Sequence, residues 1–216
     1  MIILQIDSSP LGGHSASRLL TQQIVARLRA EAPQATLVHR NLSANPVQHW
    51  EPSAFAPVDA ADGASQGTVS DTLLRELLAA DVMVIGAPMY NFAVPTQLKA
   101  WIDRIAVAGK TFRYTAQGPQ GLAGGRRVIV ASTRGGVYST TEAGRALDHQ
   151  ESWLTTLFGF LGIDGEAFHI VRAEGLAISP EARAQALEAA AQQISRLADS
   201  LFAVAGRAAG ERSVAA

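Results

Sequence analysis

The sequence contains no cysteine among its 216 residues, which excludes a disulfide framework, a thiol nucleophile and a thiolate metal site. It also lacks an excess of charge of either sign, because 18 Lys and Arg residues face 19 Asp and Glu residues. A chain with a net charge of -1 has no global field to gather a polyanion, so we expect no nucleic-acid partner. No apolar run reaches the roughly 20 residues that a spanning helix needs, so we also expect no membrane partner.

The sequence does contain enough apolar side chains for a packed core, with 48% hydrophobic and 17% charged residues. This length and composition predict one globular domain, which we place at residues 1–205. Residues 206–216 are small and polar, and we expect them to form a disordered tail. The first seven residues lack the basic region and the long apolar stretch of a signal peptide, which predicts a cytoplasmic protein.

Short β-branched runs alternate with longer segments of helical period, a pattern typical of βαβ units. The predicted fold class is therefore α/β, a doubly wound parallel five-stranded sheet with helices on both faces. The predicted strands lie at residues 2–6, 36–40, 82–87, 128–132 and 168–173. Helices are predicted after the first strand, at residues 68–80, after Pro95, at residues 147–161 and after Pro180. Residues 46–67 have no clear period and predict a long excursion.

The loop after the first predicted strand carries hydroxyl groups directly before a helix. Ser9, Ser15 and Ser17 supply these hydroxyls, and the N–H groups at the start of the helix add a partial positive charge that suits a phosphate. The loop has no lysine and neither common nucleotide-binding glycine pattern, which disfavours a nucleoside triphosphate. The structural alternative is that Ser17 only caps the helix. We expect Asp7, at the end of the strand, to cap the loop.

The loop after the third predicted strand places large apolar side chains at a sheet edge. Met89, Tyr90 and Phe92 stand within four residues of one another, around Asn91. A flat, apolar ligand would cover them, and packing under a neighbouring loop is the alternative.

The loop after the fourth predicted strand combines a cation with two glycines. Thr133 and Arg134 precede Gly135 and Gly136, whose missing side chains let backbone N–H groups approach a ligand closely. The alternative is a tight turn after a strand.

All three loops follow strand ends, and in an open parallel sheet ligands bind outside the carboxyl ends of the strands. Together they indicate one ligand with a phosphate tail and a flat, polar-edged ring, and flavin mononucleotide (FMN), bound noncovalently, has those parts. The Gly135 and Gly136 amides, with Arg134 nearby, would favour the negative edge of the reduced ring. Amides around Asn91 would serve the opposite edge. Because FMN carries the redox chemistry, we expect no catalytic protein residue.

The sequence also resembles a known family. Its motifs are Ala87-Pro-Met-Tyr-Asn-Phe-x-x-Pro-Thr-Gln-Leu-Lys-x-Trp-x-Asp103, Ala108-Gly-Lys-Thr-Phe-Arg-Tyr-Thr-x-x-Gly-Pro-x-Gly-Leu122 and Ser132-Thr-Arg-Gly-Gly136. They are similar to motifs of the bacterial FMN-dependent NADH azoreductases and NAD(P)H:quinone oxidoreductases, and the similarity extends from Leu4 to Glu174-Gly175. The resemblance implies a flavodoxin-like fold and a homodimer with two shared active sites, each subunit with one FMN. It also implies ping-pong transfer of electrons from NADH or NADPH to quinones and aromatic azo compounds, which are cleaved to amines. A protective role against electrophilic quinones follows.

The same resemblance assigns roles to individual residues. It places Ser9, Ser15, Ala16 and Ser17 at the phosphate. It places Met89, Tyr90, Asn91 and Phe92 at the isoalloxazine ring, and Thr133, Arg134, Gly135 and Gly136 at its pyrimidine edge. In this family residues 10–14 vary, so the resemblance assigns no role to them.

Residues 110–114 predict a projecting, hairpin-like excursion that ends in Gly118-Pro119. Phe112 and Tyr114 alternate along it, and exposed aromatic side chains on such an excursion are typical of an interface or a ligand cover. We predict that both contact the substrate, Tyr114 in a site completed by the second subunit. The alternative is that both rings fold back onto their own subunit.

Two other functions are compatible with parts of the sequence. A flavodoxin-type carrier would pass electrons to protein partners, but such carriers are strongly acidic and this chain is near neutral. A serine hydrolase would use Ser9 or Ser132, but the sequence has no G-x-S-x-G motif. The five histidines show no metal-ligand spacing, so we expect no metal, and a satisfied structural role for His169.

Overall fold

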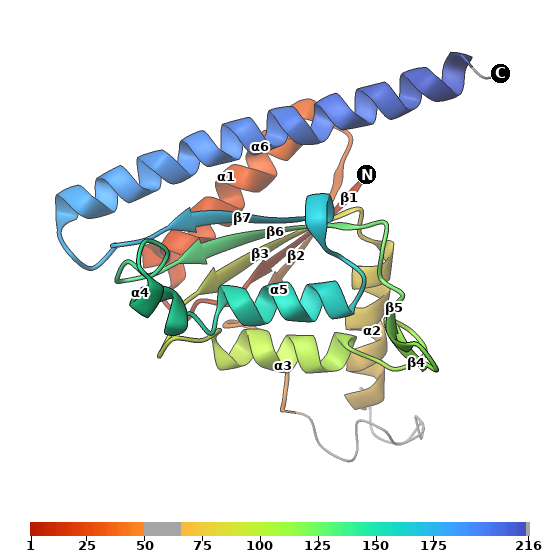
Figure 1. Ribbon diagram of the computed structural model, residues 1–216, viewed down its shortest axis with the longest axis horizontal. Coiled ribbons are helices and arrows are strands. Elements are labelled where there is room, and N and C mark those ends of the chain that lie inside the picture. Colours follow the sequence, from red (N-terminus) through yellow and green to blue (C-terminus); the bar gives the residue numbers. More distant parts are fainter. Residues whose placement is uncertain (50–65, 215–216) are drawn as a thin grey trace.

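The computed structural model of the chain describes residues 1–49 and 66–214 (Figure 1). Its main sheet is parallel throughout and has the order β2-β1-β3-β6-β7. The strands of this sheet are β1 (Ile2–Asp7), β2 (Thr36–Asn41), β3 (Val82–Pro88), β6 (Arg127–Thr133) and β7 (Phe168–Ala173). Each predicted strand is therefore confirmed within two residues at either end. The order is that of the flavodoxin-like winding, which reverses between β1 and β3.

Helices cover both faces of the sheet, as predicted. The helices are α1 (Ala16–Glu31), α2 (Gln66–Ala79), α3 (Thr96–Ile105), α4 (Glu142–Ala146), α5 (Glu151–Phe160) and α6 (Pro180–Val214), with short 3₁₀ turns η1 (Gly12–His14) and η3 (Gly165–Ala167). Figure 1 shows α1 and α6 on one face and α2, α3 and α5 on the other. Sixteen residues of the predicted excursion, 50–65, lie outside the described residues.

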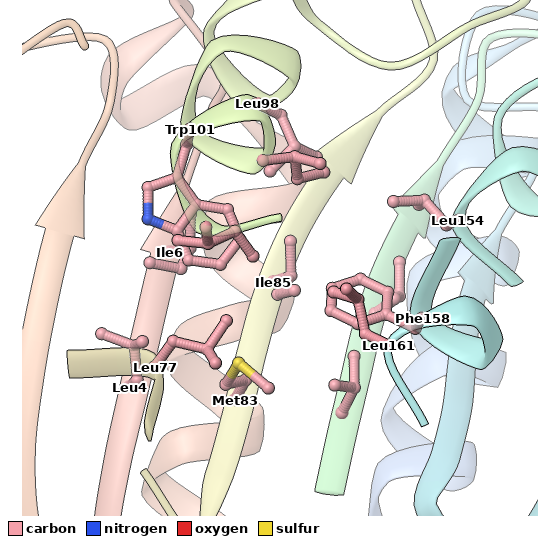
Figure 2. Packing of buried hydrophobic residues seen from close by; sticks show 14 of the residues in the cluster. Leu4, Ile6, Leu77, Met83, Ile85, Leu98, Trp101, Leu154, Phe158 and Leu161 are labelled. Carbon is pink, nitrogen blue, oxygen red and sulfur yellow. The ribbon is translucent and has the colours of Figure 1, made fainter. Parts of the chain in front are cut away.

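Each face has its own apolar core. Between α1, α6 and the sheet, Leu20, Ile24 and Ala190 are fully or almost fully buried. On the other face, Trp101 of α3 packs over β1 and Phe158 of α5 packs beside β6 (Figure 2). The central strand β3 is buried along its whole length because helices cover it on both sides. Because helices pack on both faces of the sheet, the carboxyl ends of its strands are held at fixed relative positions.

A two-stranded antiparallel hairpin interrupts the alternation, as predicted for residues 110–119. It consists of β4 (Phe112–Thr115) and β5 (Gly118–Gly121). It packs against the end of α5, through Phe112 on Phe160, and lies at the side of the sheet opposite the arrowheads of the strands (Figure 1).

Two helix boundaries differ from the prediction. The helix predicted at residues 147–161 starts at Glu151, because the Asp148 carboxylate accepts hydrogen bonds from the N–H groups of Gln150 (3.1 Å) and Glu151 (2.9 Å). At the other end of the chain, α6 continues to Val214, where the sequence predicted a tail from residue 206.

Candidate functional site

The three loops singled out in the sequence follow β1, β3 and β6, which are neighbours in the sheet. Their positions bring them together at the carboxyl edge, on the side of the arrowheads in Figure 1. Hydrogen bonds join them directly. The Met89 N–H donates to the Thr133 carbonyl (2.8 Å), and the Ser9 hydroxyl lies 3.3 Å from the Tyr90 hydroxyl. The predicted convergence of the loops is thus present in the structure.

The loop after β1 places buried hydroxyls around the start of α1. Ser15 is the N-cap, and its Oγ accepts a hydrogen bond from the Arg18 N–H (3.2 Å) and lies 3.1 Å from the Ser17 Oγ. Within the described chain, the N–H groups of Ala16 and Ser17 have no acceptor, as expected for the first residues of a helix. Hydroxyls and free amides at a positive helix end form a cradle for one phosphate.

The cap is therefore Ser15 and not Ser17, the residue that the structural alternative proposed. The Ser17 side chain is buried beside that of Ser15.

The loop after β3 contains an unusual turn. Tyr90 and Ala93 exchange two backbone hydrogen bonds, of 3.0 and 3.1 Å, across Asn91 (φ 47°) and Phe92 (φ 69°). Both central residues have left-handed backbone conformations, which a bulky residue such as Phe rarely adopts. The turn leaves the Asn91 and Phe92 N–H groups without an acceptor among the described residues. Backbone strain of this kind is typical of functional sites.

Of the two aromatic residues of this turn, Phe92 is exposed and Tyr90 is half-buried. The Phe92 side chain is 42% exposed and meets the Tyr138 ring edge to face, with centroids 6.1 Å apart. The Phe92 ring thus offers exposed apolar surface at the carboxyl edge, and the Tyr90 hydroxyl reaches Ser9 of the phosphate cradle.

The loop after β6 presents two backbone donors. In the described chain, the Gly135 and Gly136 N–H groups donate no hydrogen bond. The structure adds a second reason for glycine at these positions. A Cβ on Gly135 would lie 3.3 Å from the Ala177 Cβ, and one on Gly136 would lie 3.3 Å from the Tyr138 ring. The missing side chains make room for protein neighbours, which lets the loop pack tightly.

The prediction that the Arg134 side chain lies near the ring and favours its reduced form is wrong. Its guanidinium is completely buried beneath the loop and forms ion pairs with Asp148 (2.8 Å), Glu151 (2.6 Å) and Glu174 (3.0 Å). Glu151 pairs in turn with Arg172 (2.5 Å), and this contact raises the pKa of Arg172. A cation surrounded by carboxylates is neutralised by the protein, so only the backbone of Arg134 can serve a ligand edge.

The carboxylates around Arg134 were not predicted from the sequence. They stand 14 to 40 residues away along the chain, and no local pattern marks them.

Asp7 does not cap the loop, contrary to the expectation. Its buried carboxylate accepts side-chain hydrogen bonds from Thr21 (2.7 Å) and Gln5 (3.2 Å) and lies 2.8 Å from the His39 Nε2. These contacts direct it away from the hydroxyl cradle and toward α1 and β2, where it repels a phosphate less.

The two predicted substrate residues lie far from this edge of their own subunit. Phe112 is partly buried, with its ring 4.6 Å from that of Phe160, whereas the Tyr114 residue is 76% exposed. The Tyr114 ring packs edge to face on Phe112, 5.6 Å away. Phe112 thus supports Tyr114 from below, and the hairpin lies opposite the carboxyl edge (Figure 1).

The remaining candidates add no chemistry. The expectation for His169 holds only in part: its ring forms a hydrogen bond with the Glu166 backbone, but its Nε2 is buried without a partner among the described residues. In the same residues we find no group of three or more His, Asp or Glu side chains that could hold a metal ion. No helix in the described ranges is long and apolar enough to cross a membrane.

Known proteins resemble this chain along most of its length. A family model described as "Flavodoxin-like fold" matches residues 1–198. An FMN-dependent NADH:quinone oxidoreductase of Azospirillum brasilense is 55% identical over 92% of this chain and 98% of its own. One of Acidovorax ebreus is 54% identical over 90% of this chain and 92% of its own.

Solved structures agree with the fold. An FMN-dependent NADH-azoreductase of Bacillus anthracis, crystallised in complex with FMN, superimposes with a TM-score of 0.81 at 25% identity. The match covers 93% of this chain and 98% of that one. The chain belongs to the flavodoxin-like family and, within it, to the FMN-dependent NADH:quinone oxidoreductases.

Proposed function

We propose that this protein is an oxidoreductase that transfers electrons from NADH, through noncovalently bound FMN, to quinones. One observation carries the proposal: unpaired N–H groups and hydroxyls from three separate loops converge at one edge of the sheet. The names of the 51–55% identical relatives support the same activity. We assign one FMN to each subunit, in a single domain.

The residues at this edge fit FMN in their chemistry. The hydroxyls of Ser9, Ser15 and Ser17, with the Ala16 and Ser17 amides, would hold its phosphate. The Met89 to Phe92 turn would contact its ring, and the Thr133 to Gly136 backbone its pyrimidine edge. When bound, FMN accepts two electrons from a nicotinamide and passes them to an acceptor. The protein binds FMN, orients its ring and shields the ring from water. The proposal therefore requires no catalytic acid, base or nucleophile.

The strained turn gives the site its second set of donors. The Asn91 and Phe92 N–H groups belong to a turn held by two mutual backbone hydrogen bonds. They are therefore oriented before any ligand binds, at low entropic cost for binding. The exposed Phe92 ring would cover the ligand and exclude water from it.

We propose that donor and acceptor use the same space at the site in turn. In this assignment both must reach the same face of the bound ring, between the Phe92 turn and the loop after β6. The kinetics should then be ping-pong, with parallel double-reciprocal plots. Intersecting plots would reveal a ternary complex and overturn this part of the proposal.

We further propose a homodimer with shared active sites. Tyr114 is exposed on a hairpin at the far side of its own subunit, so it can reach a carboxyl edge only in a second copy. An exposed tyrosine with apolar area and a polar tip suits an acceptor ring. In this assignment Tyr114 contacts the acceptor and Phe112 holds it in place.

We also propose aromatic azo compounds as acceptors, which would be cleaved reductively to amines. One solved relative at 25% identity is named an NADH-azoreductase. Quinones are the more general electrophilic hazard, so the proposed role is protection against them in the cytoplasm.

The test begins with the purified protein. Its cofactor is extracted and separated by chromatography, and steady-state rates are measured for a panel of quinones and azo dyes with NADH and with NADPH. We expect FMN and reduction of quinones by NADH. Extraction of FAD, or an absence of quinone reduction by either nicotinamide, would overturn the proposed function.

A further inference from the structure

The backbone of the loop after β6 is oriented by the loop after β7. The carbonyl oxygens of three successive residues accept hydrogen bonds from the second loop: Arg134 from Leu176 (3.1 Å), Gly135 from Ala177 (3.0 Å) and Gly136 from Gly175 (2.9 Å). In a planar trans peptide the N–H points opposite to the preceding carbonyl. The Gly135 and Gly136 N–H groups therefore point away from the loop after β7.

One carboxylate, that of Glu174, ties both ends of the glycine segment together. Its Oε1 accepts hydrogen bonds from the Arg134 Nη1 (3.0 Å) at one end and from the Tyr138 and Ser139 N–H groups (3.0 and 3.1 Å) at the other. Its Oε2 accepts a hydrogen bond from the Ser139 hydroxyl. Glu174 directly precedes Gly175, so it also fixes the loop that orients the glycine carbonyls.

The surroundings of Glu174 keep it ionised. Its side chain is only 11% exposed, and burial by itself raises the pKa of a carboxyl. Hydrogen bonds from Ser139 and Tyr138 and the charge of Arg134 outweigh burial, and they hold the pKa of Glu174 below its ordinary value. An ionised carboxylate accepts hydrogen bonds that are stronger than those to a neutral group.

We propose that Glu174 is a positioning residue of the reaction: through Arg134, Tyr138 and Ser139 it holds the Gly135 and Gly136 N–H groups toward the bound ring. The inference rests on the proposed function, because it assigns the pyrimidine edge of FMN to these two donors. Reduction adds negative charge to this edge of the ring. Donors that already point at the edge therefore bind the reduced ring more strongly than the oxidised ring. Glu174 should therefore strengthen the binding of reduced FMN more than that of oxidised FMN.

The experiment compares Glu174→Ala with Glu142→Ala, a matched control at an exposed glutamate of α4. FMN affinity is measured by titration of the apoprotein, and the midpoint potential of bound FMN by anaerobic redox titration. In Glu174→Ala we expect the preference for reduced over oxidised FMN to fall about tenfold, which lowers the two-electron potential by about 30 mV. Glu174→Gln, which keeps an oxygen toward both amides, should recover most of the preference, and Glu142→Ala should retain all of it.

A second readout uses the apoprotein alone. In the wild type the Tyr138 and Ser139 amides should be protected from hydrogen exchange, and in Glu174→Ala they should exchange at least tenfold faster. If Glu174→Ala does not fold, Ser139→Ala removes a single hydrogen bond of the same carboxylate and should shift the potential in the same direction, by less. An unchanged potential in a folded Glu174→Ala protein that binds FMN would overturn the inference. Failure of the wild type to bind FMN would instead overturn the proposed function, while the exchange data would still report on the loop.

Discussion

At the scale of single residues, the phosphate cradle depends on hydroxyls that already lie close together. The Ser15 and Ser17 Oγ atoms are 3.1 Å apart and both side chains are buried. We expect the double variant Ser15→Ala, Ser17→Ala to weaken FMN binding by about 1–3 kcal/mol, the value of lost charge-assisted hydrogen bonds. Calorimetric titration of the apoprotein measures the loss. Ser195→Ala, at an exposed position of α6, is the control and should bind like the wild type. If the double variant bound FMN as tightly as the wild type, these serines would not be phosphate ligands.

A second residue-scale prediction concerns pH. Burial lowers the pKa of His169 below 6.5; a hydrogen bond that the ring donates to the Glu166 backbone carbonyl opposes this shift, and the charge of Arg127 adds to it. The unfolded chain therefore takes up this proton at a higher pH than the folded protein, so the free energy of unfolding falls as the pH drops below about 6.5. His169→Gln should lose this part of the pH dependence, measured by urea unfolding at about pH 7.5 and 5.5. A constant stability difference between variant and wild type at both values would contradict the argument.

Residue identities alone predicted where the candidate ligand-binding groups lie, but not what each side chain contacts. The serines, the aromatic turn and the glycines were found because they sit in loops after apolar runs. Arg134 was misinterpreted because its partners, Asp148, Glu151 and Glu174, are distant in the sequence. Contacts of that kind arise from tertiary packing, which no spacing rule reports.

At the scale of elements, the hairpin is anchored by an unusually close approach to the end of α5. A Cβ on Gly121 would lie only 2.1 Å from the backbone nitrogen of Gly162. We expect Gly121→Ala to destabilise the protein by about 1–3 kcal/mol, as overpacked substitutions do. The control is Gly159→Ala inside α5, whose Cβ would meet nothing closer than 3.9 Å and which should be neutral or stabilising. The melting temperatures of both variants are measured by thermal unfolding. Equal melting temperatures for Gly121→Ala and Gly159→Ala would contradict the close approach, because they would show that the hairpin moves to accommodate the added Cβ.

Element types and strand boundaries were predictable because the apolar runs are short, β-branched and bounded by turns. Strand β3 is fully buried, and its run of apolar residues marks it in the sequence. The start of α5 was not predictable from the apolar period. It is set by the Asp148 carboxylate, which accepts a hydrogen bond from the Glu151 N–H. The left-handed turn at Asn91 and Phe92 was also missed, because no glycine marks it.

At the scale of the whole molecule, the proposal requires two copies of the chain. Sedimentation of the holoprotein should give a mass about twice 22.7 kDa. Tyr114→Ala should change the ranking of quinone and azo acceptors more than it changes FMN affinity, because in the shared site Tyr114 contacts the acceptor and not the phosphate. Arg113→Ala, on the opposite face of the same strand, is the control. A fully active monomer would refute the shared site.

The central claim is that the carboxyl edge of the sheet receives electrons from NADH and delivers them to a quinone. Anaerobic stopped-flow spectroscopy of the purified holoprotein tests both half-reactions in one sample. Mixing with NADH should bleach the flavin absorbance, and subsequent mixing with a quinone should restore it without any protein partner. A yellow protein that NADH does not bleach, or that returns its electrons only to another protein, would contradict the account and favour an electron carrier.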